Sequence, residues 1–512
     1  MNGDHGQAAQ LLASLAAAEP GQVDIARKAL SEAIGAGKMD LALSLVPTIP
    51  PAKLTTEARM LLVADQIKRG HPERALPWLS VSGATGDLGF LAPLVNAWAA
   101  ADRGNAAPAL AALDQVPQRS LLTGLGDEER ALILLKFRRA AEAEPYARRA
   151  VGSAGSRERR LRLALADGFL AAGDRARALM IIEGMGEGEF AARQRIMSGK
   201  TSGEAIDNLP KALAEALTAF SIDLTRVQRS APPIALVQVA RYLDPQNSST
   251  TALLALLLAG QNRSDEALAL LRSVRPDDPL IGQIRDVQAR ILVDGKRLND
   301  AYQLVASAAM VPGADANDFS RLGDVLEAMK RHDAAADAYA RAIALSQAHG
   351  IRSNLWSLLL LRAGALQEAN RWAETKVALE QALALEPEQP LLLNFLGYTE
   401  LERGENLDSA EAMIAKASEL APDNASITDS LGWAQFKRGK VSEAIETLQK
   451  AAESDPDQAE IQEHLGDALY KSGRRFEARY AWNAALVTAE DDIAARIKAK
   501  LASGLTPANA AP

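Results

Sequence analysis

The sequence contains no cysteine, and aromatic residues make up only 4% of its 512 residues. Without cysteine the chain has no disulfide, thiolate metal site, cysteine nucleophile or lipidated cysteine. Few aromatic residues, together with a hydrophobic fraction of 48% that is mostly Ala and Leu, are typical of helix-rich chains and unfavourable for β-sheets. Long apolar runs are also missing, because the best candidate, TALLALLLAG at 251–260, is shorter than the ~18 residues that a membrane-spanning helix needs.

An excess of positive charge is absent as well. The net charge of −8 gives the whole molecule no bias toward nucleic acid or anionic membranes, so any basic partner site must be local. The N-terminal stretch AAQLLASLAAA is similar to the apolar core of a secretion signal, but the preceding MNGDHGQ contains an Asp and no Lys or Arg. It is therefore not an export signal as it stands.

What the sequence does contain is an internal repeat. NFLGYTELERG, DSLGWAQFKRG and EHLGDALYKSG place Leu-Gly at the same point, and Gly397, Gly432 and Gly466 follow one another at intervals of 35 and 34 residues. A fixed period of this length indicates an array of stacked units. A turn residue marks most units along the chain: Gly3, Gly37, Gly70, Gly104, Arg138, Gly173, Gln228, Asn262, Gly295, Lys330, Asn370, Gly404, Gly439 and Gly473.

The residues around these markers predict helical hairpins. A small residue such as Ala444 or Ala478 follows most markers by five positions, and a proline such as Pro422 or Pro456 often closes the unit. Small residues let two helices approach, Gly turns the chain and Pro ends the second helix. One pair cannot bury its apolar faces alone, whereas stacked pairs can.

The 34-residue unit, with Leu-Gly in its first helix, Ala in its second and a terminal Pro, resembles the tetratricopeptide repeat (TPR) family, and the three units that end near 488 match best. These units also resemble uncharacterised exported TPR proteins of alphaproteobacteria. The resemblance implies an all-α TPR superhelical solenoid of stacked antiparallel helix pairs. We expect about 13 full repeats, an N-terminal half repeat and a C-terminal capping helix with Ile493, Ile497 and Leu501 on one face.

Irregular spacing predicts the domain boundaries. We expect an N-terminal array at 1–183 that starts mid-repeat, a glycine-rich insertion or hinge at 184–205, a C-terminal array with its capping helix at 206–502 and a flexible tail at 503–512. Gln228 and Pro233 stand where turn and small residues belong, so their unit is degenerate. The unpaired first helix predicts a longer natural N-terminus with the missing partner helix; a helix that docks as a cap is the alternative.

Signs of catalysis are weak. SGKTSG at 198–203 is similar to a phosphate-binding loop, but Gln194 replaces the required earlier Gly and no hydrophobic strand precedes it. The five His residues are scattered without metal-ligand spacing. His464 lies near Glu463 and Asp467, which we interpret as packing or hydrogen bonding between repeats in preference to an acid–base cluster. We therefore expect no enzyme activity, metal or cofactor.

The TPR resemblance implies that residues three before and one, four and five after the helix-A glycine line a concave groove. The aromatic and acidic side chains there suit a protein segment, extended or helical, with basic or apolar residues. Filling of space between repeats is the alternative role of the aromatic residues. A ligand that ends in carboxylates is disfavoured by repulsion. The predicted groove residues are Asn394, Tyr398, Asp429, Trp433, Phe436, Glu463, Asp467 and Tyr470.

Basic residues gather between 130 and 177, whereas 386–470 is strongly acidic. This basic region either contacts phosphate, anionic lipid or an acidic protein, or is only a solvated face. Its possible patch comprises Arg138, Arg139, Arg148, Arg149, Arg157, Arg159, Arg160 and Arg162.

Together these observations favour a non-catalytic protein-interaction scaffold or adaptor. The resemblance to exported proteins implies a periplasmic or outer-membrane-associated location, with the cytoplasm as the alternative. A binder of nucleic acid or anionic membrane through 138–162, and a regulatory subunit of an envelope enzyme, stay open as alternative functions. The sequence does not predict an oligomeric state.

Overall fold

The computed structural model describes residues 5–81, 88–116, 124–186, 188–227, 234–352 and 354–511. These residues form helices and no strand, as the sequence predicts. The chain divides into two compact units, Met1–Arg321 and Leu322–Pro512, which are described separately below as unit 1 and unit 2. Within the described ranges, no helix has both the length and the apolar character needed to cross a bilayer.

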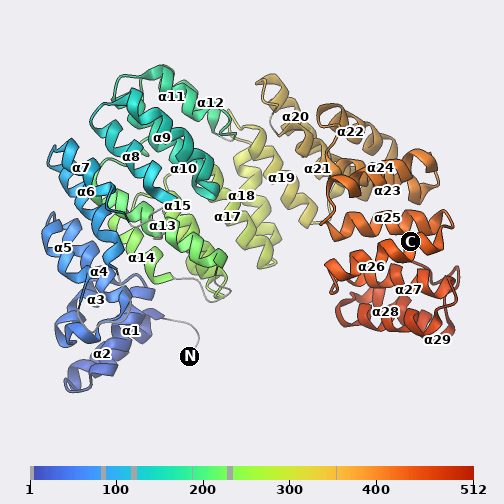
Figure 1. Ribbon diagram of the computed structural model, residues 1–512, viewed down its shortest axis with the longest axis horizontal. Coiled ribbons are helices and arrows are strands. Elements are labelled where there is room, and N and C mark those ends of the chain that lie inside the picture. The colour runs from blue at the N-terminus through green and yellow to red at the C-terminus, as the bar shows by residue number, and fades with distance from the viewer. Residues whose placement is uncertain are drawn as a thin grey trace. The chain divides into compact units, whose positions relative to one another are not determined.

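Unit 1 is a series of helices in which consecutive members pack as pairs across short turns (Figure 1). Its α-helices are α1 (His5–Ala18), α2 (Val23–Gly35), α3 (Met39–Leu45), α4 (Thr56–Lys68), α5 (Pro72–Leu79), α6 (Ala92–Asp102), α7 (Ala106–Leu113), α8 (Gly126–Lys136), α9 (Ala140–Ser153), α10 (Glu158–Ala171), α11 (Arg175–Ile182), α12 (Glu189–Met197), α13 (Leu209–Val227), α14 (Ile234–Leu243), α15 (Ser248–Ala259), α16 (Ser264–Leu271), α17 (Ile281–Asp294) and α18 (Leu298–Ala309). Short 3-10 turns are η1 (Val46–Thr48), η2 (Pro51–Lys53), η3 (Gly89–Leu91) and η5 (Gly155–Arg157).

Unit 2 repeats the same pairing, and α19 (Ala316–Ala328) crosses the boundary between the units. In unit 2, odd-numbered helices are the first members of the pairs, here called A helices, and even-numbered helices are the second members, or B helices. The remaining helices are α20 (His332–Ala348), α21 (Leu355–Glu368), α22 (Trp372–Leu385), α23 (Pro390–Arg403), α24 (Leu407–Leu420), α25 (Ala425–Lys437), α26 (Val441–Ser454), α27 (Ala459–Lys471), α28 (Arg475–Thr488) and the terminal α29 (Asp491–Ser503).

The repeated glycine of the A helices makes room for a bulky side chain of the B helix. A Cβ atom on Gly323 would lie 2.5 Å from the Tyr339 ring, and one on Gly432 would lie 2.6 Å from Leu448. Gly466 meets Trp482 in the same way. In all three pairs the contact joins positions sixteen residues apart. The Leu-Gly phrase is therefore a packing requirement of the pair, because any larger residue would push the two helices apart.

The turns between paired helices fall where the markers predict. Gly439 and Gly473 have φ angles of 80° and 90°, in the left-handed region that glycine adopts without strain. Asn370 and Lys330 take the same conformation with φ of 59° and 57°. One marker is shifted: the left-handed residue is Lys296 and not the predicted Gly295, which lies at φ −77° as the cap of α17. Markers Gly3 and Gln228 lie outside the described residues.

Helices α13 and α14 fold back onto earlier members of unit 1, next to α4 and α6 in Figure 1. The Tyr242 hydroxyl donates to Asp65 at 3.0 Å, and the Gln238 amide donates to the carbonyl of Gly35 at 3.2 Å. Residues from both helices belong to the same apolar core as α2, α4 and α6. The degenerate repeat thus covers other repeats of unit 1; its irregular residues Gln228 and Pro233 lie outside the described part.

Most of the segment at 184–205 is fixed within unit 1. Helix α12 packs on α10 and α11, and the loop that follows it wraps a buried carboxylate. Asp167 accepts hydrogen bonds from the backbone N–H groups of Ser202, Gly203 and Glu204 at 2.6, 2.9 and 3.0 Å. These N–H groups are the kind that a phosphate-binding loop would present to its ligand. The backbone of the SGKTSG stretch therefore binds a carboxylate of the chain itself, that of Asp167. A hinge at 184–205 stays a prediction.

The C-terminal residues do not extend freely, in contrast to the flexible tail expected at 503–512. Asn509 and Ala511 are buried, and the Ala511 N–H donates to Asp467 at 3.1 Å. The Asn509 amide also donates to the carbonyl of Gly504 at 3.0 Å. Because a buried carboxylate of α27 recruits the backbone of the tail, residues up to Ala511 form part of the cap; Pro512 lies outside the described residues.

Replacing Gly466 by Ala tests the glycine requirement. The added methyl group would overlap Trp482, so we expect Gly466→Ala to lower the free energy of unfolding by about 1–3 kcal/mol. Gly364, within α21, has no atom within 4 Å of a built Cβ. Gly364→Ala is thus the matched control and should stabilise the protein by about 0.5–1 kcal/mol. Urea denaturation measures both, and equal effects of the two substitutions would contradict the packing role.

Candidate functional site

The last A helix, α27, has its predicted groove residues covered by the C-terminal cap. Lys500 of α29 is fully buried and places its Nζ 2.6 Å from Glu463 and 2.7 Å from Asp467. Arg496 adds a second cation, 2.9 Å from Glu463. Burial opposes ionisation of Glu463, but the hydrogen bonds from Arg496 and Lys500 outweigh it and lower the pKa of Glu463. These two carboxylates therefore hold the cap and are not available to a partner.

The predicted groove residues of α25 form a stacked column between repeats. The His464 ring of α27 stacks on Trp433, with ring centroids 4.1 Å apart, and Phe436 stacks on Trp433 at 4.8 Å. His464 Nδ1 lies 2.8 Å from Asp429. Trp433 is only 1% exposed, so it fills the space between repeats, the alternative considered for the aromatic residues. The interpretation of His464 as an inter-repeat contact is confirmed.

The predicted groove residues of α23 stay partly exposed. Asn394 and Tyr398 are both half-buried, and α23 packs with its neighbours α22, α24 and α25. Burial and the negative charges of Glu402, Asp429 and Glu460 raise the pKa of Tyr398. The Oδ1 atom of Asn394 is buried without a hydrogen-bond partner. An unpaired buried acceptor costs free energy, so a rotation of this side chain that brings the oxygen to an N–H donor from outside the chain would be favourable.

The structure thus separates the eight predicted groove residues into two classes. Asn394, Tyr398, Phe436 and Tyr470 keep part of their surface accessible. Asp429, Trp433, Glu463 and Asp467 are buried and engaged within the chain. Sequence spacing alone did not reveal this difference, because Lys500 and Arg496, which neutralise the acidic pair, come from the terminal helix α29, and their contact with α27 lies outside the repeat pattern. Whether the accessible residues bind a partner stays a prediction.

The basic region of unit 1 is largely neutralised by carboxylates. Arg157 lies 2.9 Å from Glu128 and 3.1 Å from Glu215, and all three side chains are largely buried. Arg160 is also buried, 2.9 Å from Glu215. These pairs join η5 and α10 to α8 and α13, so the two arginines hold the back-folded helix in place. Burial raises the pKa of neighbouring Glu129 to about 8, so this carboxyl group is neutral at pH 7.

Most other arginines of the predicted patch also have carboxylate partners. Arg149 lies 2.8 Å from Asp127, and Arg148 lies 3.0 Å from Glu144. Arg139 and Arg162 pair with Glu142 and Glu158. Arg138 is exposed in a left-handed turn, and Arg159 lines the pocket described next. The patch therefore presents much less free positive charge than the sequence count of 130–177 suggests.

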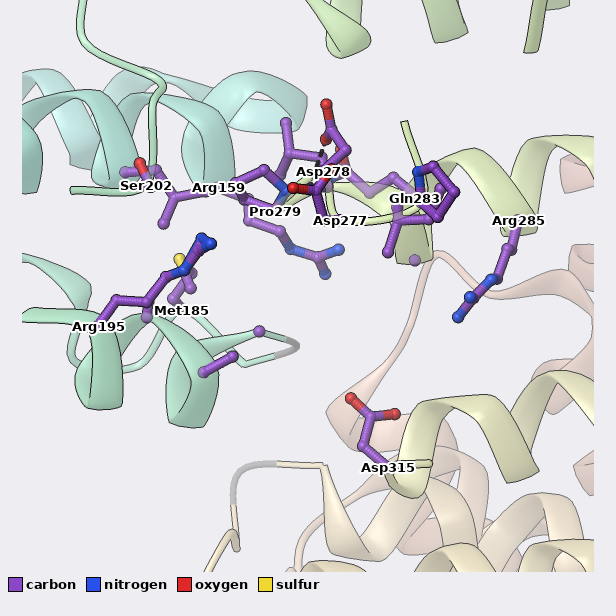
Figure 2. A pocket seen from close by; sticks show the side chains of 18 of the residues that line it. Arg159, Met185, Arg195, Ser202, Asp277, Asp278, Pro279, Gln283, Arg285 and Asp315 are labelled. Carbon is purple, nitrogen blue, oxygen red and sulfur yellow. Dashed lines mark hydrogen bonds between the residues drawn. The ribbon is translucent and has the colours of Figure 1, made fainter. Parts of the chain in front are cut away.

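A pocket of about 290 Å³ lies in unit 1 where α10 and α12 face the loop before α17. Figure 2 shows Arg159 and Arg195 on one side of this hollow, and Asp277 and Asp278 in the loop beside it. Arg285 pairs with Asp318 at 3.1 Å, so opposite charges within the lining partly cancel. Sequence analysis missed this pocket. The only trace of it was the irregular glycine-rich segment, because the lining residues come from segments about 80 residues apart.

Comparison with known families agrees with this architecture. Residues 432–473 match a family model described as TPR repeat, and residues 319–349 match one described as tetratricopeptide repeat. The chain is also 35% identical over 88 residues to the TPR repeat-containing protein PA4667 of Pseudomonas aeruginosa. That match covers 17% of this chain and only 15% of PA4667, so most of either protein lies outside it.

Solved structures with similar helical arrays share little sequence with this chain. A chain of the APC/C hetero-tetramer Cut9-Hcn1 matches with 15% identity and a TM-score of 0.40, over 97% of this chain and 99% of that one. Yeast Tom70 matches with 11% identity and a TM-score of 0.39, over 87% and 95%. YrrB, described as a TPR protein with an unusual peptide-binding site, matches with 19% identity and a TM-score of 0.29, over 38% and 97%. None of these likenesses identifies a partner of this chain.

Removing the charge of Lys500 tests whether the buried ion pairs hold α29 against α27. Lys500→Met leaves Glu463 and Asp467 buried with one charge partner fewer, so we expect a loss of about 3–5 kcal/mol in the free energy of unfolding. Lys498→Met changes an exposed residue of the same helix and should cost less than about 0.5 kcal/mol. Urea denaturation compares the two variants. Similar stabilities would show that the buried ion pairs do not hold α29.

The His464–Asp429 contact predicts a dependence of stability on pH. Burial disfavours the charged ring, but the carboxylate of Asp429 outweighs this and raises the pKa of His464 above its ordinary value of 6.5. A group with a raised pKa stabilises the fold below its unfolded pKa and loses this contribution as pH rises through its folded pKa. The free energy of unfolding of the protein, minus that of His464→Gln, should therefore decrease as pH rises above 6.5. The exposed His349→Gln is the control, and a flat difference would contradict the charged contact.

Proposed function

We propose that this tetratricopeptide repeat protein is a non-catalytic scaffold that binds a basic protein segment along the accessible face of α23 and α25. Tetratricopeptide repeats support protein interaction in general, and the choice of this face is our inference. The observation that carries it is the setting of Tyr398, an accessible ring among the carboxylates of Glu402, Asp429 and Glu460. A Lys or Arg side chain placed over this ring would gain both a cation–π contact and charge attraction.

Asn394 gives the same face a means of recognising a polypeptide backbone. Its amide oxygen is buried without a partner within the described residues, so a backbone N–H of the bound segment would satisfy it once the side chain rotates toward solvent. Leu391, Asn394, Tyr398 and Glu402 follow the i, i+3, i+7, i+11 spacing of one helix face, and Leu391 is exposed. Apolar contact, a backbone acceptor and negative charge thus lie in one line on α23.

The face is bounded on one side by the C-terminal cap. At α27 the residues equivalent to Asn394 and Tyr398 are Glu463 and Asp467, which already bind Lys500 and Arg496 of the chain's own α29. This internal contact is a model for the proposed ligand, because it brings basic side chains of a helix to acidic groups of an A helix. We infer that the partner segment offers Lys or Arg in a comparable arrangement to α23 and α25.

Binding of nucleic acid or anionic membrane through 138–162 has less support, because carboxylates pair with most of its arginines. A role as a regulatory subunit of an envelope enzyme is compatible with the proposed scaffold. The periplasmic or outer-membrane location is proposed only from the resemblance to exported repeat proteins. Cell fractionation with an antibody against the native protein would distinguish it from the cytoplasmic alternative.

A display library of random peptides, selected on the intact protein, tests the proposed face. We expect the selected peptides to be rich in Lys and Arg. Tyr398→Ala with Glu402→Lys should weaken their binding at least tenfold, because the variant removes the ring and reverses a charge. The matched control is Glu419→Lys, an equal charge reversal at an exposed position of α24. Circular dichroism must show unchanged helix content. Acidic selected peptides, or equal affinity for all proteins, would contradict the proposal.

A further inference from the structure

Helix α28 carries an apolar stripe that faces solvent. Phe476, Tyr480 and Val487 are 85%, 78% and 83% exposed, and Asn483 between them is also exposed. Their spacing of four, three and four residues places all four on one helix face. Exposure of three large hydrophobic side chains in a row is unfavourable in water, and such a patch usually marks an interaction site.

The stripe is not a property of the repeat. At the same register, 34 residues earlier, α26 has Ser442, Glu446, Gln449 and Glu453. Three of these four are exposed and all are polar, as expected for an outward face. The substitution of all but one of these positions by large apolar residues in α28 is thus specific to the last helix pair.

The stripe is also not the face against which a further repeat would stack. In α26, three of the four equivalent residues stay exposed although α27 packs behind that helix. In α28, the side that meets the rest of unit 2 contains Ala478, Trp482 and Ala485, all buried. The stripe is therefore separate from the surface on which a neighbouring repeat packs.

Charges at the two ends of the stripe are complementary to each other. Arg475 lies at its N-terminal end without a carboxylate partner among the described residues, and its guanidinium contacts the Tyr470 ring. At the C-terminal end, Glu490, Asp491 and Asp492 are exposed without a cation partner in the described part of the chain. Two copies of α28 in antiparallel arrangement would place the basic end of each beside the acidic end of the other.

We propose that α28 is a self-association surface, through which two copies of this chain pack antiparallel about a twofold axis. The stripe is symmetric about its midpoint, which lies equally far from Phe476 and Val487 and equally far from Tyr480 and Asn483. The twofold axis therefore puts Phe476 of one copy against Val487 of the other, and Tyr480 against Asn483. The amide of Asn483 is then within reach of a tyrosine hydroxyl, so the polar member of the stripe also gains a partner.

The size of the patch predicts a weak and reversible dimer. Aromatic side chains bury about 150–250 Å² each, so the three apolar residues of two copies would bury on the order of 1,000 Å². That area is near the lower limit for specific association, and we expect dissociation in the micromolar range. This inference does not rest on the proposed peptide site, because α28 is a B helix and the peptide face belongs to α23 and α25.

Sedimentation velocity of the full-length protein over a concentration series tests the proposal. We expect the sedimentation coefficient to rise from that of a monomer to that of a dimer. Phe476→Glu with Tyr480→Glu should abolish the rise, with an unchanged circular dichroism spectrum. The control is Val377→Glu, which occupies the register of Tyr480 on α22 and is half exposed; it should dimerise like the parent. A parent protein that stays monomeric, or a double variant that still dimerises, would overturn the proposal.

Complementary charge variants test the antiparallel arrangement itself. Arg475→Glu makes both ends of the stripe acidic, and Glu490→Lys with Asp492→Lys makes both ends basic. Each variant alone should dimerise at least tenfold more weakly than the parent because like charges meet. An equimolar mixture should regain dimers. If the mixture stays monomeric while both variants keep their helix content, the antiparallel twofold arrangement is wrong. Peptide binding by the α23 face should be unaffected in all variants.

Discussion

The structure depends on the close approach of two helices within each pair, which a glycine in the A helix permits. In the pairs of α19, α25 and α27, this glycine meets Tyr339, Leu448 or Trp482 sixteen residues later. The bulky side chain fills the space that a Cβ would take, so a gap in one helix is matched to a projection from the other. In two of these pairs a hydrogen bond accompanies the packing contact. Asp324 accepts from the Tyr339 hydroxyl, and Asp467 accepts from the Trp482 ring N–H. The same few residues therefore set both the spacing and the rotation of the helices.

This contact also explains how the array ends. Asp467, fixed by Trp482, accepts further hydrogen bonds from Lys500 and from the backbone of Ala511. One buried carboxylate thus joins the last helix pair, the capping helix and the terminal residues. The burial of Glu463 and Asp467 leaves Asn394 and Tyr398 of α23, Phe436 of α25 and Tyr470 of α27 as the predicted groove residues that still meet solvent. The choice of α23 as the proposed binding face follows from this difference in exposure between neighbouring repeats.

The sequence predicts the fold well because the repeat appears in local residues. The turn positions and the glycine of the A helix are visible in single units, and residues 319–349 and 432–473 match repeat models. The degenerate unit near 228–233 was recognised, but its back-folding onto α2 and α4 depends on distant contacts such as Tyr242 with Asp65. No local pattern contains that information, because the partners are 177 residues apart.

The candidate site was less predictable for the same reason. Position within the repeat identified Asn394 and Tyr398 as accessible, yet the equivalent Glu463 and Asp467 are buried under the terminal helix α29, whose Lys500 contacts both carboxylates. The exposed stripe of α28 was overlooked because Phe476, Tyr480 and Val487 have the spacing of a core face. Only the structure shows that the alanines and Trp482 supply the core of this helix pair instead.

The central claim is that a partner segment contacts the face of α23 while the equivalent face of α27 is closed. Site-specific photo-crosslinking tests it most directly, with a photoreactive phenylalanine analogue placed in turn at Tyr398 of α23 and at exposed Lys471 of α27. The account predicts covalent adducts with a selected basic peptide from position 398 and none from position 471. Adducts from position 471 alone, or from neither position under conditions where the peptide is bound, would contradict it.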